Sequence, residues 1–214
     1  MPDLDFKIEE VDIEPFAAVP TLAFGLRIMA RDRPIRNIAL ASQVRIEPAR
    51  RGYVPAEQER LSELFGEKRR WGQTLRGFLW DHVNLSIPPF ETECLVKLPL
   101  VCSHDFNIAA TKYFHGLDEG VTPLSFHFSG AVFYEGLDGR LQIGQIAWNK
   151  DASFNLPIAT WRKLMAQYYP DATWLQIPND LFERLSHYKR VNGFTDWEKA
   201  LSSLIGAATL EPTS

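Results

Sequence analysis

Residues 123–148 read Pro-Leu-Ser-Phe-His-Phe-Ser-Gly-Ala-Val-Phe-Tyr-Glu-Gly-Leu-Asp-Gly-Arg-Leu-Gln-Ile-Gly-Gln-Ile-Ala-Trp, and this stretch decides the fold class. Large apolar residues occupy alternate positions, which is the period of a β-strand with one face on a core. They are Leu124, Phe126, Phe128, Val132 and Tyr134. His127 has the opposite parity and is expected on the outer face. The stretch therefore predicts a strand of an antiparallel sheet.

The same stretch predicts a hairpin. Asp138-Gly139 is a favoured two-residue turn in which both residues take positive φ. In the returning strand Leu141 and Ile143 share one parity, whereas Ile146 has the other. A bulge near Gly144 would reconcile the two parities, because glycine tolerates the bulge conformation.

Other segments repeat the strand pattern with turns at the spacing of a β-sandwich. Strands are predicted within residues 6–16, 20–31, 35–47, 74–87 and 91–101. Residues 104–117 are ambiguous, and we predict a strand there because four residues fit period two, whereas the helical stripe of Ile108, Thr111 and His115 is poor. The four are Phe106, Ile108, Ala110 and Phe114. A short strand is also predicted over residues 173–177.

Helical patterns interrupt and follow the strands. Residues 55–65 predict a short inserted helix that packs through Leu61, Leu64 and Phe65 and stops at Gly66. A C-terminal helix is predicted to open at Pro157. Its buried face would hold Ile158, Trp161, Leu164, Met165 and Tyr168.

Two more helices are predicted near the end of the chain. Asn179 would cap the first, which ends at Asn192-Gly193. Thr195 and Glu198 form a capping box for the second.

These patterns together predict an α+β fold, an antiparallel β-sandwich-like domain with a short inserted helix and C-terminal helices packed on it. The predicted organisation has an antiparallel β domain over residues 1–150, with the inserted helix near 55–65. A helical region over 151–206 packs on the same core, and a disordered tail covers 207–214.

Length and composition limit the classes of function. The chain has 214 residues, a formal net charge of −4 and 12% aromatic residues, enough for a substantial core. A negative net charge argues against bulk attraction to nucleic acid or anionic lipid. The N-terminus lacks the pattern of a signal peptide, and no apolar run approaches the length of a membrane span. We therefore expect a cytoplasmic protein.

The two cysteines are candidates for chemistry. Cys94 and Cys102 would lie about 26 Å apart on one continuous strand, too far for a disulfide, so buried free thiols are expected. Cys102-Ser103-His104-Asp105 suggests a nucleophile with its base. However, residues 102 and 104 on one strand are too far apart for the hydrogen bond that a catalytic pair needs. A strand end with a buried cysteine is the simpler interpretation.

A metal site is the second candidate. The low-probability ligands are Cys94, Cys102, His104, Asp105 and His115, with Asp118 and Glu119 nearby. No His-x-x-x-His or Cys-x-x-Cys spacing occurs in the sequence, so a metal site would need ligands from distant segments. Phosphate-loop and nucleophile-elbow motifs are also absent. No cofactor and no catalytic residue is expected.

A cluster of basic and aromatic residues is the third candidate. Between Arg45 and Trp80 the chain has seven arginines, one lysine and two tryptophans, although five glutamates interrupt them. A helix with a mixed-charge wet face would explain the pattern, and so would a protein-binding surface. The predicted binding residues are Arg51, Lys68, Arg69, Arg70 and Trp71.

Several short motifs together resemble a bacterial family known only as a domain of unknown function. They include Gln43-Val44-Arg45-Ile46-Glu47-Pro48, Leu64-Phe65-Gly66 with Arg70-Trp71, Cys102-x-His104-Asp105-Phe106 and Lys112-Tyr113-Phe114. The resemblance covers most of residues 6–205. It implies a gene near those of uptake nickel–iron hydrogenases, and hence an accessory or assembly role.

The sequence thus favours a non-enzymatic accessory or binding protein that assists assembly of a redox enzyme such as a hydrogenase. Its expected partner is another protein, with no membrane and no nucleic acid. The alternative is a metalloprotein or enzyme that uses a Cys/His/Asp cluster around residues 94–119.

Overall fold

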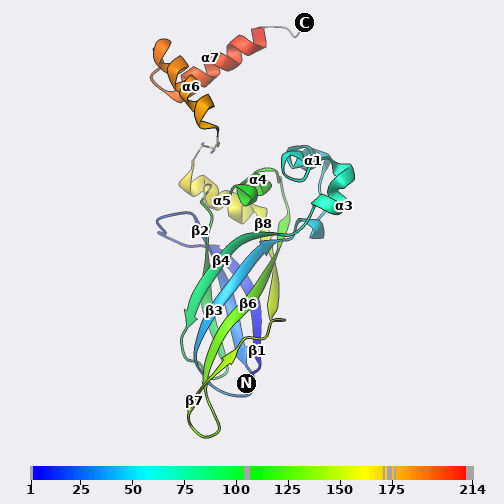
Figure 1. The fold of residues 1–214 in the computed structure, drawn as a ribbon, viewed down its shortest axis with the longest axis vertical. Coiled ribbons are helices and arrows are strands. Elements are labelled where there is room, and N and C mark those ends of the chain that lie inside the picture. The colour runs from blue at the N-terminus through cyan, green and yellow to red at the C-terminus, as the bar shows by residue number, and fades with distance from the viewer. Residues whose placement is uncertain (1, 104–106, 171, 173–174, 176, 211–214) are drawn as a thin grey trace. The chain divides into compact units, whose positions relative to one another are not determined.

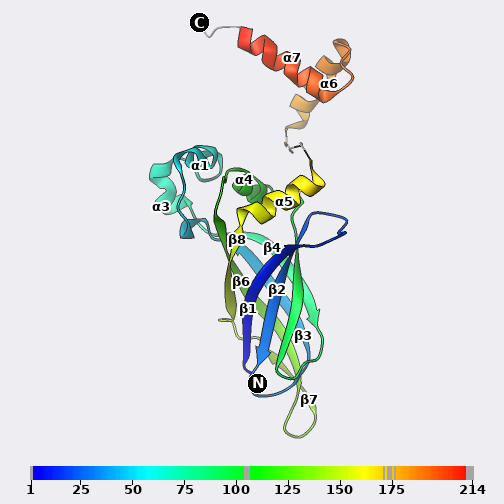
Figure 2. The ribbon, with the colours of Figure 1, turned by 180° about the vertical axis from the view of Figure 1, so that it is seen from behind.

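The structure is a computed structural model, and it describes residues 2–103, 107–170, 172, 175 and 177–210. Residue contacts divide the chain into two compact units, Met1–Ala172 and Thr173–Ser214. Each unit is described by itself below. Figures 1 and 2 show the ribbon from opposite sides.

The first unit contains two antiparallel sheets. One has the order β1-β2-β5, with β1 at Leu4–Ile13, β2 at Thr21–Ala30 and β5 at Glu93–Val101. The other has the order β4-β3-β6 and then β7, with β8 also paired to β6. Its strands are β3 Ile35–Ile46, β4 Phe78–Ile87, β6 Val121–Glu135, β7 Leu141–Gln145 and β8 Asp151–Pro157.

The core lies between the two sheets and confirms the predicted sandwich. The five alternating apolar residues of β6 are all buried, and His127 on the opposite face is exposed. The ring of Phe128 stacks on that of Phe6 from β1, with centroids 4.5 Å apart. Phe126 meets Phe24 of β2 edge to face at 5.2 Å. Aromatic pairs of this kind join one sheet to the other.

The hairpin is present, but its turn differs from the prediction. Gly136 N–H donates to Arg140 O at 2.8 Å, and Gly139 N–H donates to Gly136 O at 3.0 Å. Gly139 has φ 71°, whereas Asp138 is not among the positive-φ residues. These bonds describe a three-residue loop with one left-handed glycine, which a Gly in that position favours over the two-residue turn.

The bulge predicted near Gly144 is absent from the described ladder. Residues Leu141–Gln145 pair with Ala131–Glu135 without a register shift. The side chains of Leu141 and Ile143 are both 64% exposed, while Ile146 is buried. No bulge is needed, because Leu141 and Ile143 lie on the exposed face and only Ile146 faces the core.

The inserted region between β3 and β4 is helical, as predicted, but in several short pieces. They are η1 Pro48–Arg50, α1 Pro55–Arg60, α2 Ser62–Phe65, η2 Lys68–Arg70 and α3 Trp71–Thr74. Leu61 and Phe65 are buried, and Leu64 is partly buried against the core. Gly66 ends α2 with φ 74°. In Figure 1 the insertion lies at the same end of the sandwich as α4 and α5.

The strand predicted within residues 104–117 is wrong for the part that the structure describes. Residues Ile108–His115 form α4. The side chain of Asn107 accepts a hydrogen bond from Ala110 N–H and thereby caps the helix. The buried residues of the helix are Ala110, Tyr113 and Phe114, which lie on one face. The residues of this segment thus fit a helical spacing as well as the alternation of a strand. The cap at Asn107 favours the helix.

The sheet extends past residue 150, where the sequence analysis placed the end of the β region. Strand β8 pairs with the first half of β6, and α5, Ile158–Tyr168, follows it directly. Helix α5 packs on the sandwich through the predicted face, in which Ile158, Trp161, Leu164 and Met165 are buried. Both cysteines are free, as predicted, but only Cys102 is buried, whereas Cys94 is partly exposed.

The second unit holds α6, Asn179–Val191, and α7, Trp197–Leu210. Asn179 begins α6 without a side-chain cap, and Asn192-Gly193 ends it as predicted. Asp196, not Thr195, caps α7, because its carboxylate accepts from Lys199 N–H at 2.9 Å. This bond lowers the pKa of Asp196. The tail predicted to be disordered is helical through Leu210, and the strand over 173–177 falls largely outside the described residues.

We predict that Trp161→Ala lowers the free energy of unfolding by about 3–5 kcal/mol, the usual cost of truncating a large buried aromatic. Trp161 is only 4% exposed and stacks on Phe114 at 4.9 Å. Urea unfolding measures the loss. Gln167→Ala, on the exposed side of the same helix, is the control and should change little. An unchanged unfolding midpoint for Trp161→Ala would show that α5 is not docked by this face.

Candidate protein-interaction site

A buried carboxylate anchors the inserted region. Glu57 is 2% exposed and lies in the first turn of α1. Its carboxylate accepts hydrogen bonds from Arg51 Nη2 at 3.0 and 3.1 Å, from Asp118 N–H at 2.9 Å and from Val54 N–H at 3.3 Å. The charge is thus paired and its oxygens are satisfied. The bond to Asp118 joins the insertion to the segment that leads into β6.

The guanidinium of Arg51 is held on several sides. It lies over the ring of Tyr53 at 4.9 Å from the centroid, and Nη2 also donates to Glu119 O at 3.3 Å. The hydroxyl of Tyr53 donates to Pro48 O at 2.8 Å and lies 2.9 Å from the hydroxyl of Tyr113. Burial raises the pKa of both tyrosines. The two phenols are therefore neutral structural hydrogen-bonding groups.

An aromatic cluster continues from Tyr53 to the basic segment. The ring of Trp71 meets Tyr53 edge to face at 5.3 Å and Phe65 at 6.0 Å. Its indole Nε1 donates to Gly66 O at 2.9 Å. Trp71 is half-buried. Ring contacts hold its apolar face, and the hydrogen bond holds its indole N–H.

Three consecutive cations lie between these anchored residues. Lys68, Arg69 and Arg70 form the short helix η2 and are all exposed. Arg69 pairs with Glu67 at 2.5 Å, and both side chains are well exposed. Lys68 and Arg70 have no ion-pair partner among the residues that the structure describes. A 3₁₀ helix has three residues per turn, so the three cations lie within a single exposed turn.

The structure divides the five predicted binding residues into two groups. Lys68, Arg69 and Arg70 form an exposed cationic surface, which we call the basic turn. Arg51 and Trp71 are instead part of the packing that supports it. The sequence analysis missed Glu57. Its buried carboxylate pairs with Arg51, and this ion pair makes Arg51 part of the packing and not of the exposed surface. The position of Glu57 three residues after Val54, at the start of a helix, was the available signal.

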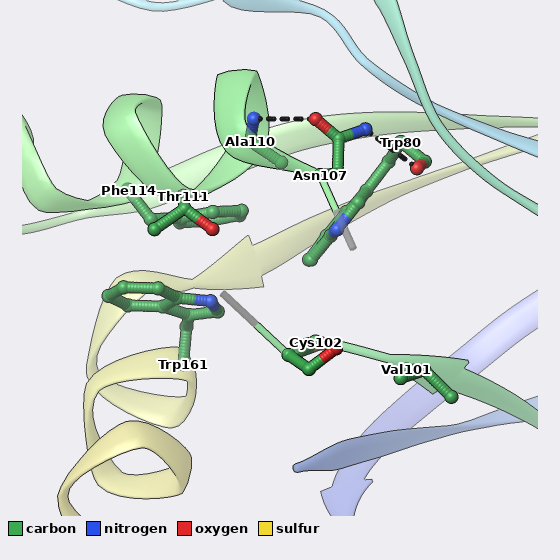
Figure 3. A pocket seen from close by; sticks show the side chains of 9 residues that line it. Trp80, Val101, Cys102, Asn107, Ala110, Thr111, Phe114 and Trp161 are labelled. Carbon is green, nitrogen blue, oxygen red and sulfur yellow. Dashed lines mark hydrogen bonds between the residues drawn. The ribbon is translucent and has the colours of Figure 1, made fainter. Parts of the chain in front are cut away.

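The region of Cys102 is packed around a small cavity (Figure 3). The cavity has a volume of about 10 Å³, which is about the space of one water molecule. Its lining includes Trp80, Cys102, Asn107, Thr111, Phe114 and Trp161. Cys102 is 5% exposed, and burial raises the pKa of its thiol to about 12. A protonated thiol is a poor nucleophile and a poor metal ligand.

The remaining candidate ligands are distributed over distant elements. Cys94 lies near the opposite end of β5 from Cys102, and burial raises the pKa of its thiol. His115 is exposed on α4, and its ring contacts Trp161 edge to face at 5.2 Å. Asp118 pairs with Arg60 at 2.6 Å. His104 and Asp105 fall outside the described residues, and the described ones contain no cluster of three potential ligands.

A protein-family model matches nearly the whole chain. The sequence model of a family of unknown function, DUF6084, matches residues 1–213. The chain belongs to DUF6084. None of the helices that the structure describes in this DUF6084 protein is long and apolar enough to cross a membrane.

Comparison with characterised proteins adds little to the DUF6084 assignment. No curated protein matches the sequence. Among solved structures, a β-glucosidase from Kluyveromyces marxianus is 8% identical with a TM-score of 0.26, over 73% of this chain and 15% of that enzyme. β-Glucosidase 3B from Thermotoga neapolitana is 13% identical with a TM-score of 0.23, over 72% of this chain and 17% of that enzyme. The chain thus spans less than a fifth of either enzyme, and TM-scores this low carry no argument.

We predict that Cys102 resists alkylation in the folded protein, because its buried thiol stays protonated at pH 8. The test uses Cys94→Ser, in which Cys102 is the remaining cysteine, and follows iodoacetamide labelling by mass spectrometry. One label should be incorporated after unfolding in urea and almost none before it. The matched Cys102→Ser protein reports the half-buried Cys94, which should react faster. Labelling of folded Cys94→Ser at the rate of a free thiol would contradict the prediction.

Proposed function

We propose that this protein is a non-enzymatic accessory protein that binds an acidic surface of a partner protein through the basic turn. The observation that carries the proposal is the placement of Lys68, Arg69 and Arg70 together on an exposed turn. Folding requires no such concentration of exposed cations, because exposed charges contribute little to stability. Arginine can recognise carboxylates through two parallel hydrogen bonds.

The support beneath the basic turn favours binding. Trp71 on one side and Phe65 on the other pack against the body of the first unit. The hydroxyl of Thr74 donates to Phe65 O at 2.6 Å and to Arg70 O at 3.1 Å, which joins the two ends of the turn. A backbone that is already ordered loses less conformational entropy on binding than a free loop does.

The family resemblance suggests which partner to test first. If genes of this family lie near those of uptake nickel–iron hydrogenases, a hydrogenase subunit or one of its maturation proteins is the natural partner. An accessory protein in that setting needs a recognition surface and no catalytic centre of its own. The competing proposal, a metalloprotein or enzyme around residues 94–119, has less support because Cys102 is buried with a raised thiol pKa.

The basic turn is tested with the double variant Arg69→Ala/Arg70→Ala. We expect its urea unfolding to differ from wild type by less than about 1 kcal/mol, since both side chains are exposed. Affinity capture from the native host, quantified by mass spectrometry, should lose a specific partner. The purified double variant should bind the purified partner about tenfold or more weakly than wild type does. Binding of the wild-type protein should weaken as salt is added.

The matched control removes two exposed cations elsewhere. Lys7→Ala/Arg140→Ala makes the same change in net charge, and the side chains are 65% and 86% exposed. This control should capture the partner as wild type does. If both double variants capture the partner equally well, or if both fail to capture it, the basic turn has no specific role in binding. Recovery of hydrogenase components among the lost proteins would support the assembly role, and their absence would oppose it.

A further inference from the structure

Strand β7 forms an open edge of the five-stranded sheet. Among the strands that the structure describes it pairs with β6 alone, and the register over Leu141–Gln145 has no shift. At one end of this ladder Gly136 N–H donates to Arg140 O at 2.8 Å, and at the other Ile146 N–H donates to Gly130 O at 2.9 Å. Bonded and non-bonded positions alternate in an antiparallel pair. The even-numbered residues of β7 therefore bond to β6, and the N–H and C=O groups of residues 141, 143 and 145 point away from it.

The edge at β7 is unprotected, unlike the other edges of the two sheets. Natural edge strands discourage pairing with a further chain through charged residues and proline. The other edge strands carry such residues, namely Asp5, Glu9, Glu10 and Asp12 on β1, Asp81 on β4, Pro99 on β5, and Asp151 and Pro157 on β8. Strand β7 reads Leu-Gln-Ile-Gly-Gln and has neither. An uncharged, partly apolar edge is a site for pairing with another strand.

Exposed apolar side chains gather around this edge. Leu141 and Ile143 are each 64% exposed, and Ile143 pairs with Phe133 of β6. Leu137 in the hairpin loop is 100% exposed, and Trp148, shortly after β7, is 94% exposed. Figure 1 shows the hairpin at the end of the sandwich opposite α4 and α5, away from the helices of the first unit. The patch thus surrounds a row of outward backbone groups.

The arrangement of the patch matches a second copy of itself. Leu137 lies six residues before Ile143 and Trp148 lies five residues after it. If β7 pairs in antiparallel with β7 of another copy about Ile143, the hairpin loop of each copy lies beside the segment after β7 of the other. Leu137 of one copy then approaches Trp148 of the other, twice over. A two-fold axis produces such a self-matching interface.

Charge and area also favour a second copy as the occupant. An acidic or basic segment would find no counter-charge on Leu141–Gln145, whereas β7 of another copy brings no charge to it. A buried tryptophan removes about 200 Å² from water, and a leucine-sized side chain about 100 Å². The exposed apolar side chains of two copies, with their strand edges, would bury roughly 1,000 Å², the area from which an interface is specific.

We infer that β7 pairs in antiparallel with β7 of a second copy across a two-fold axis at Ile143, which makes the protein a symmetric homodimer. Residues 141, 143 and 145 of one copy would exchange main-chain hydrogen bonds with residues 145, 143 and 141 of the other. The pairing uses the whole edge, so it closes at two copies. The insertion lies at the other end of the sandwich, and the dimer would therefore present two basic turns.

The test is sedimentation velocity of the full chain over a series of protein concentrations. Wild type should pass from monomer to dimer as the concentration rises from micromolar to millimolar. Ile143→Lys places two like charges opposite each other and should raise the dissociation constant of the dimer about tenfold or more. Leu95→Lys is the control, because residue 95 is 57% exposed on the β5 edge, and it should dimerise as wild type does. A wild type that stays monomeric, or that grows beyond a dimer, would overturn the proposal.

A charge swap tests the two-fold axis itself. Ile143→Lys and Ile143→Glu should each dimerise poorly alone, because residue 143 faces its own copy. An equimolar mixture of the two should form a dimer about tenfold or more tightly than either alone, since the opposite charges then meet. A mixture that stays as weak as its components would show that residue 143 does not face itself, and would overturn the proposal.

The flanking contact has its own matched pair of variants. Trp148→Ala should weaken the dimer about tenfold, because each copy loses an apolar contact. Phe16→Ala removes another aromatic ring that is 101% exposed, and it should leave the dimer unchanged. Equal weakening by both variants would show that the effect is not specific to this edge and would count against the proposal.

Amide exchange of the wild-type protein, followed by NMR, needs no variant to fold. The amides of Leu141, Ile143 and Gln145 should exchange more slowly as protein concentration rises. Slower exchange elsewhere with these three unchanged would assign the dimer to another surface and overturn the proposal. Arg69→Ala/Arg70→Ala should dimerise as wild type does, so failure of this proposal is distinguishable from failure of the proposed function.

Discussion

The carboxylate of Glu57 lies where water cannot solvate it, so the protein itself has to provide the counter-charge and the hydrogen-bond donors. A buried charge that lost its partner would cost several kcal/mol. Arg51 and the backbone N–H groups of Val54 and Asp118 meet this requirement, and Asp118 comes from a segment far along the chain. The short helices of the insertion are too short to be stable alone. Their position follows from this contact and from the aromatic packing beside it.

The body of the first unit is thus a scaffold with two distinct kinds of surface. At the insertion, packed residues hold a turn whose cations project into solvent. At β7, an edge strand offers outward backbone groups among exposed apolar side chains. Figure 2 shows this hairpin at the end of the first unit opposite α4 and α5. Neither surface needs a reactive side chain, and we propose that the basic turn recognises another polypeptide.

Some of this arrangement could be predicted from the sequence, for identifiable reasons. Period-two patterns gave the strands, because alternation on a half-buried strand is local information. The same logic failed at Ile108–His115, where Asn107 caps a helix and period two was a coincidence of composition. It also placed the end of the sheet before β8, since that strand has few apolar residues.

The candidate site could be predicted only in part. Charge density marked Lys68, Arg69 and Arg70, but it could not separate them from Arg51. Arg51 differs from the other three because it pairs with the buried Glu57. The burial of Glu57 follows from tertiary packing, which the local sequence does not reveal. That β7 forms an open edge could not be predicted for a similar reason, because strand order is set by long-range pairing. His104 and Asp105, outside the described residues, leave the sequence motif at Cys102 as a prediction.

A double-mutant cycle between Arg51 and Glu57 tests most directly whether this buried pair organises the insertion. Unfolding free energies would be measured in urea for wild type, Arg51→Met, Glu57→Gln and the double variant. We expect Arg51→Met alone to lose about 3 kcal/mol or more, because it leaves the carboxylate without its counter-charge. Glu57→Gln should then restore part of that loss in the Arg51→Met background, giving a coupling of at least about 1 kcal/mol. Additive losses that are each below about 0.5 kcal/mol would contradict the account.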